Sequence, residues 1–289
     1  MKNKKITYKE VRAIQKEDIR ANRIIYSHNR HFSSPFTYIF IKLGISPNTI
    51  TTFNFFIPIL GFIFLSLGTY LSIIVGILFF NLFFIFDQSD GEAARLQNRG
   101  SIEGIYLDII NHYIYGCCIG LGLGYGLSRL YHNEIYIVLG FILTLIFVLE
   151  YAIPHVLNSI VVKGLIDNKT YDKIESVDKV RKLLDRYIYG GRSWANSNII
   201  SKLVGIYPFQ GLIFSVHFIL PIILMLTLME IFLSASFEFP ILIYGLNIGL
   251  ISSYLFVLAT SKIIWIIGYI SRIVRNRLIT KFLMASKDS

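Results

Sequence analysis

The chain has 289 residues, a length that would suit one or two soluble domains. Its composition argues against an ordinary soluble protein, because 54% of the residues are hydrophobic and only 16% are charged, compared with about 25% charged residues in a typical soluble domain. The net charge of +10 suits either nucleic acid or anionic lipid as a partner, and the positions of the charges decide between them. The two cysteines are adjacent, which excludes a disulfide scaffold.

Residues 1–47 form a polar and basic segment, with ten lysines and arginines and three acidic residues. Ser33-Ser34-Pro35 predicts the start of a helix, because proline is favoured at the first helical position. The apolar stretch 36–43 is then expected to be an amphipathic juxtamembrane helix that lies at the membrane interface. An ordinary buried helix is the alternative interpretation.

Six apolar runs of membrane-spanning length follow this segment. None shows the two-residue alternation that is typical of barrel strands, so helices are the expected spanning structure. The sequence therefore predicts an all-α integral membrane protein with six transmembrane helices and an N-terminal interfacial helix. The expected spans are 49–70, 71–95, 104–127, 135–162, 206–233 and 241–269.

Basic residues gather on one side of this six-helix arrangement. Ten precede the first span, two lie near the second turn, nine lie in 163–202 and five follow from residue 272 onward, whereas the opposite loops hold only Arg129. This asymmetry predicts that both termini are cytoplasmic, with the cell (inner) membrane as the expected location. It also favours anionic lipids over nucleic acid as partners.

The same pattern divides the chain into three parts. Residues 1–47 are expected to be a cytoplasmic segment that ends in the juxtamembrane helix. Residues 48–275 are expected to form a six-helix transmembrane domain, with a long cytoplasmic loop at about 163–205. Residues 276–289 are expected to be a cytoplasmic tail.

The most informative segment joins the second and third expected spans. Asp87 and Asp90 are three residues apart, and Asp108 and His112 are four apart, so each pair shares one helical face. The helices turn around near Arg99, and all four residues lie nine to thirteen positions from it. An antiparallel hairpin therefore places them at a similar depth, just below the cytoplasmic surface.

Carboxylates inside a membrane are costly, and three of them together need protons or divalent cations. Their oxygen ligands favour Mg²⁺ or Mn²⁺ over Zn²⁺, as one or two ions. Small residues beside them, Gly91, Ala93, Ala94 and Gly104, allow a bulky ligand or a neighbouring helix to approach the backbone.

The segment from Asp87 to His112 resembles the signature of the CDP-alcohol phosphotransferase family, D-x2-D-G-x2-A-R-x8-G-x3-D-x3-D. The stretch 43–51, which reads LGISPNTIT, is similar to the family's lead-in to its first span. The eighth fixed position holds His112 in place of aspartate. The seven positions that match are Asp87, Asp90, Gly91, Ala94, Arg95, Gly104 and Asp108.

The resemblance implies a membrane transferase with six helices. Such an enzyme moves a substituted phosphoryl or phosphonyl group from a CDP-linked donor to an alcohol acceptor and releases CMP, in phospholipid, phosphonolipid or glycan biosynthesis. At least one substrate would be lipidic, and a homodimer is possible. The active site would lie on the cytoplasmic side.

The same resemblance implies roles for individual residues. Asp87, Asp90 and Asp108 would hold the metal. His112 would replace the family's aspartate as the base that deprotonates the acceptor hydroxyl. Contact of His112 with the metal or the donor phosphate, or an inactive site, are the alternatives. The donor-binding set would be Asn48, Thr51, Asp87, Asp90, Gly91, Ala94, Arg95 and Gly104.

Candidate acceptor-binding residues lie near the acidic hairpin and in later segments. Lys262 lies within the sixth expected span and needs a partner or ligand there, unless it snorkels to the surface. Glu150 and His155 are five residues apart and do not share a helical face, so structural hydrogen bonds are the alternative for both. The full candidate set is Arg99, Glu150, His155, Arg192 and Lys262.

Two other functions compete with the enzyme. A divalent-cation transporter would spread polar residues through the bilayer depth, whereas these carboxylates cluster near one surface. A non-catalytic membrane scaffold would keep the fold without turnover, and the histidine at position 112 keeps that alternative open.

Overall fold

The computed structural model describes residues 6–19, 24–167, 216–236, 241–243 and 246–275. The chain divides into two compact units. The first comprises Met1–Val148 and Ser215–Phe256, and the second comprises Leu149–Phe214 and Val257–Ser289.

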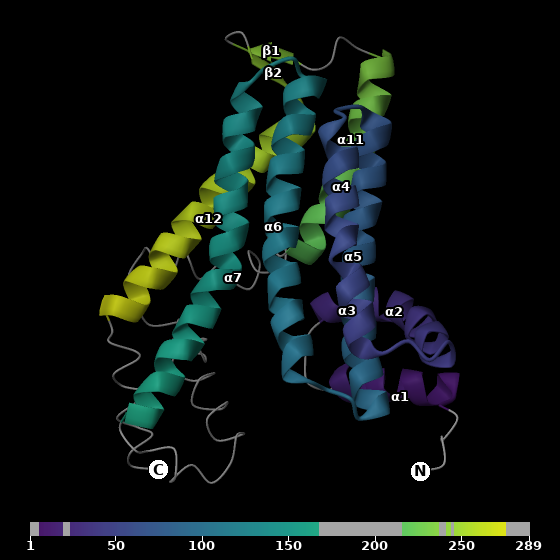
Figure 1. Ribbon diagram of the computed structural model, residues 1–289. Helices are drawn as coiled ribbons and strands as arrows, with labels where there is room; N and C mark the ends of the chain where they lie inside the picture. Colours follow the sequence, from purple (N-terminus) through teal and green to yellow (C-terminus); the bar gives the residue numbers. More distant parts are fainter. Residues whose placement is uncertain (1–5, 20–23, 168–215, 237–240, 244–245, 276–289) are drawn as a thin grey trace. The chain divides into compact units, whose positions relative to one another are not determined.

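Helices build the first unit (Figure 1). Helices α7 and α12 begin in the first unit and continue into the second. The helices are α1 (Tyr8–Ile19), α2 (Ile24–Lys42), α3 (Pro47–Asn54), α4 (Phe56–Ser66), α5 (Tyr70–Gln97), α6 (Ile102–Leu130), α7 (Ile135–Asp167), α11 (Val216–Ser236) and α12 (Leu250–Arg275).

The helical membrane class expected from the sequence is confirmed. Four helical segments are long and apolar enough to cross a membrane, namely Pro47–Ser66, Tyr70–Gln97, Ile135–Leu157 and Leu250–Arg275. Helix α6 has ample length at 29 residues, but its six glycines and its polar side chains lower its hydropathy. The apolar part of α11 is shorter than a full span. The count of six spans therefore stays a prediction.

The first expected span consists of two helices. Ser46 caps the start of α3, where its side chain accepts a hydrogen bond from the amide of Thr49, and Pro47 occupies the first turn. The helix is interrupted at Phe55. Pro58 explains the break, because it has no N–H to donate to the carbonyl of Asn54.

The predicted helix start at Pro35 is wrong. Helix α2 begins at Ile24, and Pro35 lies inside it. Proline normally breaks a helix because it removes one backbone hydrogen bond. Here Ser33 and Thr37, on either side of the proline, are both buried and hydrogen-bonded to α5. These tertiary contacts outweigh the local preference.

The sixth expected span also begins later than predicted. Residues 241–248 include two short antiparallel strands, β1 (Ile241–Ile243) and β2 (Leu246–Ile248), with Ile241 opposite Ile248. Isoleucine is β-branched and favours extended backbone in a short segment. Helix α12 starts only at Leu250, after the hairpin.

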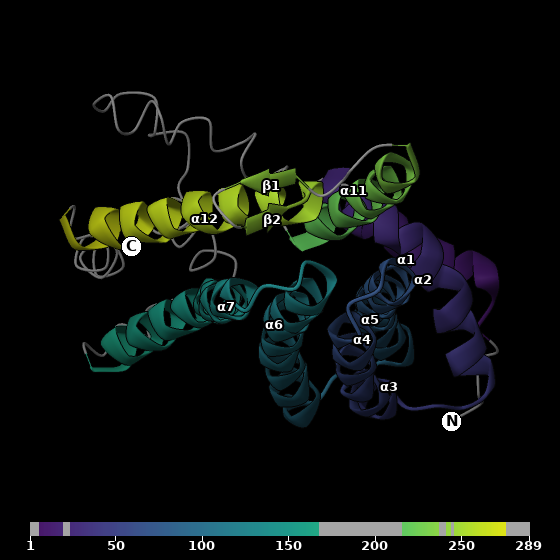
Figure 2. The same cartoon turned by 90° about the horizontal axis from the view of Figure 1, so that it is seen from above.

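Glycines set the close packing of α6 between α4 and α7 (Figure 2). A Cβ atom added to Gly124 would lie 2.7 Å from the Cα of Gly140 on α7. A Cβ atom added to Gly122 would lie 3.1 Å from the Leu65 side chain on α4. Small residues allow such backbone approach between membrane helices.

A buried carboxylate joins α11 to the start of α12. Glu230 is fully buried and accepts a hydrogen bond from the amide of Ile251 at 2.6 Å. The Tyr131 hydroxyl donates to the same carboxylate at 2.8 Å. A negative charge at a helix N-terminus is stabilising, so Glu230 acts as the cap of α12.

Candidate active site

The hairpin that carries the acidic residues is closed by local caps. Asn98 ends α5 in the left-handed conformation, with φ of 51°, a conformation that asparagine tolerates better than most residues. The amide of Arg99 then donates to the Ala94 carbonyl at 3.0 Å. Ser101 caps α6 by accepting from the amide of Gly104 at 3.0 Å. The two helices are therefore joined by a short turn and run antiparallel to each other.

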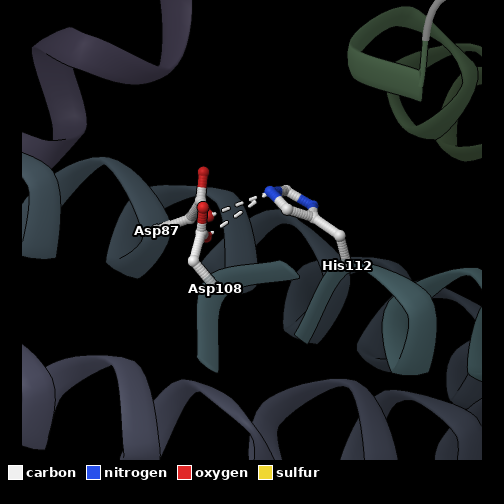
Figure 3. A group of neighbouring side chains, drawn as sticks. All are labelled: Asp87, Asp108 and His112. Atoms are coloured by element: carbon white, nitrogen blue, oxygen red, sulfur yellow. Dashed lines mark ion pairs between the residues drawn. The ribbon is translucent and has the colours of Figure 1, made fainter. Parts of the chain in front are cut away.

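Three of the four predicted polar residues meet at one point (Figure 3). His112 Nε2 lies 3.3 Å from Asp87 Oδ1 and 3.6 Å from Asp108 Oδ1. One ligand atom from each of the three residues lies within 4.8 Å of the other two. The Asp108 side chain is 44% exposed, against 21% for each of the other two, so the group opens on the Asp108 side.

Asp90 lies outside this group and has a different partner. It is buried, and its Oδ2 accepts a hydrogen bond from the Thr51 hydroxyl at 2.7 Å. The carbonyl of Thr51 accepts in turn from Asn111 Nδ2 at 2.8 Å. Helix α3 is thereby hydrogen-bonded to both α5 and α6 at the level of the site.

Asn48 and Gly104, both expected to bind the donor, contact each other. Asn48 Nδ2 donates to Ser101 Oγ at 2.9 Å. A Cβ atom at position 104 would lie 2.7 Å from Asn48 Oδ1. A side chain at this position would therefore have to displace the Asn48 amide.

Aromatic rings pack directly beneath the polar group. The Phe83 ring packs edge-on against His112, with 5.6 Å between the ring centroids. Tyr115 lies 4.9 Å from both Phe83 and Phe84, and all three aromatic residues are buried. The site is therefore polar on its open side and apolar on its inner side.

The remaining donor-site candidates lie on α5 around the same carboxylates. Gly91 and Ala94 follow Asp87 and Asp90 by four residues each, so they share the same face of the helix. Arg95 is exposed one turn further on. Gly91 and Ala94 are half-buried, and Arg95 Nη1 lies 3.4 Å from the place that a Cβ atom on Gly91 would occupy.

The acceptor candidates divide between the two units. Arg99 is exposed at the hairpin turn of the first unit. In the second unit Lys262 is 5% exposed, and its Nζ lies 2.6 Å from both oxygens of Glu150. Lys262 therefore pairs with a carboxylate of the neighbouring helix instead of snorkelling to the surface. His155 is half-buried in the second unit, and Arg192 lies outside the described residues.

Sequence reasoning missed a buried carboxylate near the motif. Glu92 is 2% exposed and accepts hydrogen bonds from Ser33 and Thr37 on α2. A glutamate buried inside a membrane helix costs free energy unless it has hydrogen-bond partners. The presence of Glu92 in this segment therefore indicated that partners exist. Its partners were not identifiable, because they lie 59 and 55 residues away in the sequence.

The donor set fits a divalent cation. Two carboxylates and one imidazole supply three ligand atoms. Mg²⁺ or Mn²⁺ would be held by the carboxylate oxygens of Asp87 and Asp108, because both ions prefer oxygen ligands. The three atoms lie within 4.8 Å of one another, so one cation would be within reach of both carboxylates with His112 beside it.

Comparison with known protein families agrees with this geometry. Residues 44–177 match the family model of CDP-alcohol phosphatidyltransferase. This segment belongs to the CDP-alcohol phosphatidyltransferase family. The family assignment made from the hairpin motif is confirmed, and the matched residues include α3 to α6 and all of the acidic hairpin. The search of curated proteins gives no match.

Membership identifies the chemistry of the segment at a coarse level. CDP-alcohol phosphatidyltransferases are transferases that use a CDP-alcohol donor and an alcohol acceptor, typically with a divalent metal. The four candidate spans agree with an integral membrane protein.

Proposed function

We propose that this protein is a multi-pass membrane transferase that moves a substituted phosphoryl or phosphonyl group from a CDP-linked donor to an alcohol. CMP is the other product. The observation that supports this most strongly is the convergence of Asp87, Asp108 and His112 inside the segment that matches the family. No observation on the described residues favours cation transport.

Asp87, Asp90 and Asp108 would hold Mg²⁺ or Mn²⁺, which when bound screens the diphosphate and stabilises CMP as the leaving group. The small residues Gly91 and Ala94 make room for the nucleotide beside α5. Arg95, which is exposed, would contact a phosphate oxygen of the donor.

His112 is the proposed general base. Imidazole accepts a proton near neutral pH, and Asp87, 3.3 Å from Nε2, stabilises the imidazolium that results. The acceptor oxygen forms a bond to the distal phosphorus of the donor, the bond from that phosphorus to the CMP oxygen breaks, and the acceptor proton passes to His112. The product is a phosphodiester, or a phosphonate ester if the donor carries a C–P bond.

We infer that at least one substrate is lipidic and that the site opens toward the cytoplasm. The polar group lies about two to three helical turns from the hairpin turn, and we expect that turn at the membrane surface. There a soluble partner and a membrane-bound partner have access to the same carboxylates. Anionic lipids would contact the basic segments on this side.

A CMP-release assay on the purified protein in lipid nanodiscs tests the proposal. The donors are CDP-diacylglycerol, a CDP-linked small alcohol and a CDP-linked phosphonate. Each is paired with glycerol phosphate, inositol phosphate or a lipid alcohol. We expect one pair to release CMP only when acceptor and Mg²⁺ or Mn²⁺ are both present. Absence of cation-dependent CMP release from all donors would contradict the proposal.

A further inference from the structure

Helix α5 carries a third carboxylate on its other side. Glu92 follows Asp90 by two residues and Asp87 by five, so its side chain leaves the helix on the side opposite to theirs. It is outside the group of possible metal ligands and is 2% exposed. The transfer chemistry proposed above does not use it.

Glu92 binds two hydroxyls of α2 at short distances. Ser33 Oγ donates to its Oε1 at 2.8 Å, and Thr37 Oγ1 donates to its Oε2 at 2.6 Å. Both α2 residues are fully buried and share one helical face. Hydrogen bonds to a carboxylate are stronger than bonds between neutral groups, and burial strengthens them further.

Two further residues of α5 contact α2, and each of them is next to a site residue in the sequence. The Phe86 ring, next to Asp87 in the sequence, lies 5.5 Å from Phe36 and 5.2 Å from Phe40, between ring centroids. Ser89, next to Asp90, places its Oγ 3.3 Å from the carbonyl oxygen of Ser33. Figure 2 shows α2 beside α5.

These contacts fix α5 from the side opposite to α3. On the site side, the Thr51 hydroxyl bonds to Asp90. Helix α4 packs against α5 at Gly76, Phe79 and Phe80, which precede Asp87 by about two helical turns or more. At the level of the site α5 is held by α2 and α3, so loss of the α2 contacts would let this part of α5 rotate and would change the distance from Asp87 to Asp108 on α6. A displacement of about 1 Å in a reacting constellation lowers turnover by about 10²-fold.

We propose that Glu92 is a positioning residue for this transfer reaction. Through Ser33 and Thr37 it fixes the rotation of α5, and with it the separation of Asp87 from Asp108. The inference rests on the proposed function, since it assigns Glu92 a role in the geometry of that same site. It also makes α2 a part of the catalytic unit.

The test compares Glu92→Ala, Glu92→Gln and Thr37→Val with Glu134→Ala, an exposed glutamate on the α6–α7 connection, as the control. The measurements are kcat and KM for CMP release and, separately, Mn²⁺ affinity of the purified protein by electron paramagnetic resonance. We expect Glu92→Ala to lower kcat by about 10²-fold, with the acceptor KM within about threefold of wild type. Mn²⁺ affinity should fall about tenfold, because one ligand is displaced.

Glu92→Gln should restore most of both values. The amide oxygen accepts from one hydroxyl, and the amide NH₂ donates to the other, so the contact survives without the charge. Thr37→Val should reproduce part of the loss and add little in the Glu92→Ala background, because it removes one of the two hydrogen bonds that Glu92→Ala removes. If Glu92→Gln is as inactive as Glu92→Ala, the charge itself is needed and the positioning role is wrong.

Other outcomes also decide the matter. Wild-type kcat per folded molecule in Glu92→Ala or Thr37→Val would overturn the inference. If Glu92→Ala does not fold, Thr37→Val and Glu92→Gln carry the test. If the wild-type protein releases no CMP, the proposed function fails, while the Mn²⁺ measurement still decides on Glu92. Unchanged Mn²⁺ affinity in Thr37→Val would then reject the inference.

Discussion

His112 replaces a carboxylate by a group that carries no negative charge, at a position 3.3 Å from Asp87 and 3.6 Å from Asp108. Two carboxylates that face a neutral or protonated imidazole repel each other less than three carboxylates would. The same imidazole is able to take up a proton from an acceptor alcohol. At the residue scale, the proposed effect of the substitution is therefore to supply a base that works near neutral pH, with one negative charge fewer beside the proposed cation.

Replacement of His112 by alanine tests this role. We expect His112→Ala to lower kcat for CMP release by about 10²- to 10⁴-fold, the usual contribution of a general base. Mn²⁺ affinity should stay within about threefold of wild type, because the proposed ligands are carboxylates. The matched control is His132→Asn, an exposed histidine with φ of 53°, a conformation that asparagine tolerates. A large loss of Mn²⁺ affinity in His112→Ala would make His112 a ligand instead.

Asp108 is the most exposed of the converging residues and the proposed link between α6 and the cation. Asp108→Asn keeps the shape of the side chain and removes its charge. We expect turnover to be abolished while the protein still inserts into the membrane and keeps its thermal stability within about 1 kcal/mol, the range for a partly exposed polar change. Activity assays and thermal unfolding in nanodiscs measure both. Substantial surviving turnover would contradict cation binding at Asp108.

The spacing of the motif was sufficient to predict the convergence of Asp87, Asp108 and His112. Helical periodicity placed the residues on shared faces, and an antiparallel turn placed them at one depth. Contacts between distant segments were not predictable in this way. The bond from Thr51 to Asp90 and the pair of Glu150 with Lys262 depend on tertiary packing.

At the scale of elements, glycines determine how closely α6 approaches its neighbours. The stripe formed by Gly116, Gly120 and Gly124 faces α7, while Gly122 and Gly126 face α4. Since apolar side chains gain little from leaving lipid, membrane helices associate through close packing of this kind. The position of Asp108 and His112 therefore depends on glycines that follow them on α6 by about one to five helical turns.

Gly124→Ala tests this packing. The added methyl group meets the Gly140 backbone at 2.7 Å, where no side chain is able to move aside. We expect a loss of about 1–3 kcal/mol in stability, as for other overpacked interiors, measured by thermal unfolding in detergent. Gly100→Ala is the control, because a Cβ atom there has nothing within 4 Å. Equal stability of the two variants would show that α6 and α7 are not in tight contact.

The positions of α5 and α6 were predicted to within a few residues, whereas irregular features were not. The expected spans 71–95 and 104–127 correspond to α5 and α6. Three features differ from the elements expected from the sequence. They are the break at Phe55, the continuation of α2 through Pro35 and the two strands within 241–248. Each departure involves a proline or a short β-branched run whose conformation is set by its surroundings.

At the scale of the whole molecule, the distribution of basic residues predicts the orientation in the membrane. Helix α6 has 29 residues and a length of about 43 Å at 1.5 Å per residue, more than the roughly 30 Å hydrocarbon core. Its two ends, the hairpin turn at Arg99 and the connection at Glu134, should therefore lie on opposite sides. The acidic group lies nearer to the Arg99 end.

Single cysteines at these two ends test the orientation. In a Cys117→Ala, Cys118→Ala background, Gly100→Cys should react with a membrane-impermeant maleimide only after the inner face is opened. Glu134→Cys should react from outside in intact cells. Retained CMP release in each variant controls for folding. Reaction of Gly100→Cys from outside would contradict a cytoplasmic site.

Mn²⁺ binding to the purified protein tests the central claim most directly, because it asks whether the two helices share one cation site that accepts a CDP group. Electron paramagnetic resonance measures free Mn²⁺ with and without a CDP-linked donor, in wild type, Asp87→Asn and Asp108→Asn. We predict that wild type binds Mn²⁺, that the donor tightens this binding, and that each variant weakens it by at least about tenfold. Equal Mn²⁺ affinity in all three proteins, unaffected by the donor, would contradict a shared cation site on α5 and α6.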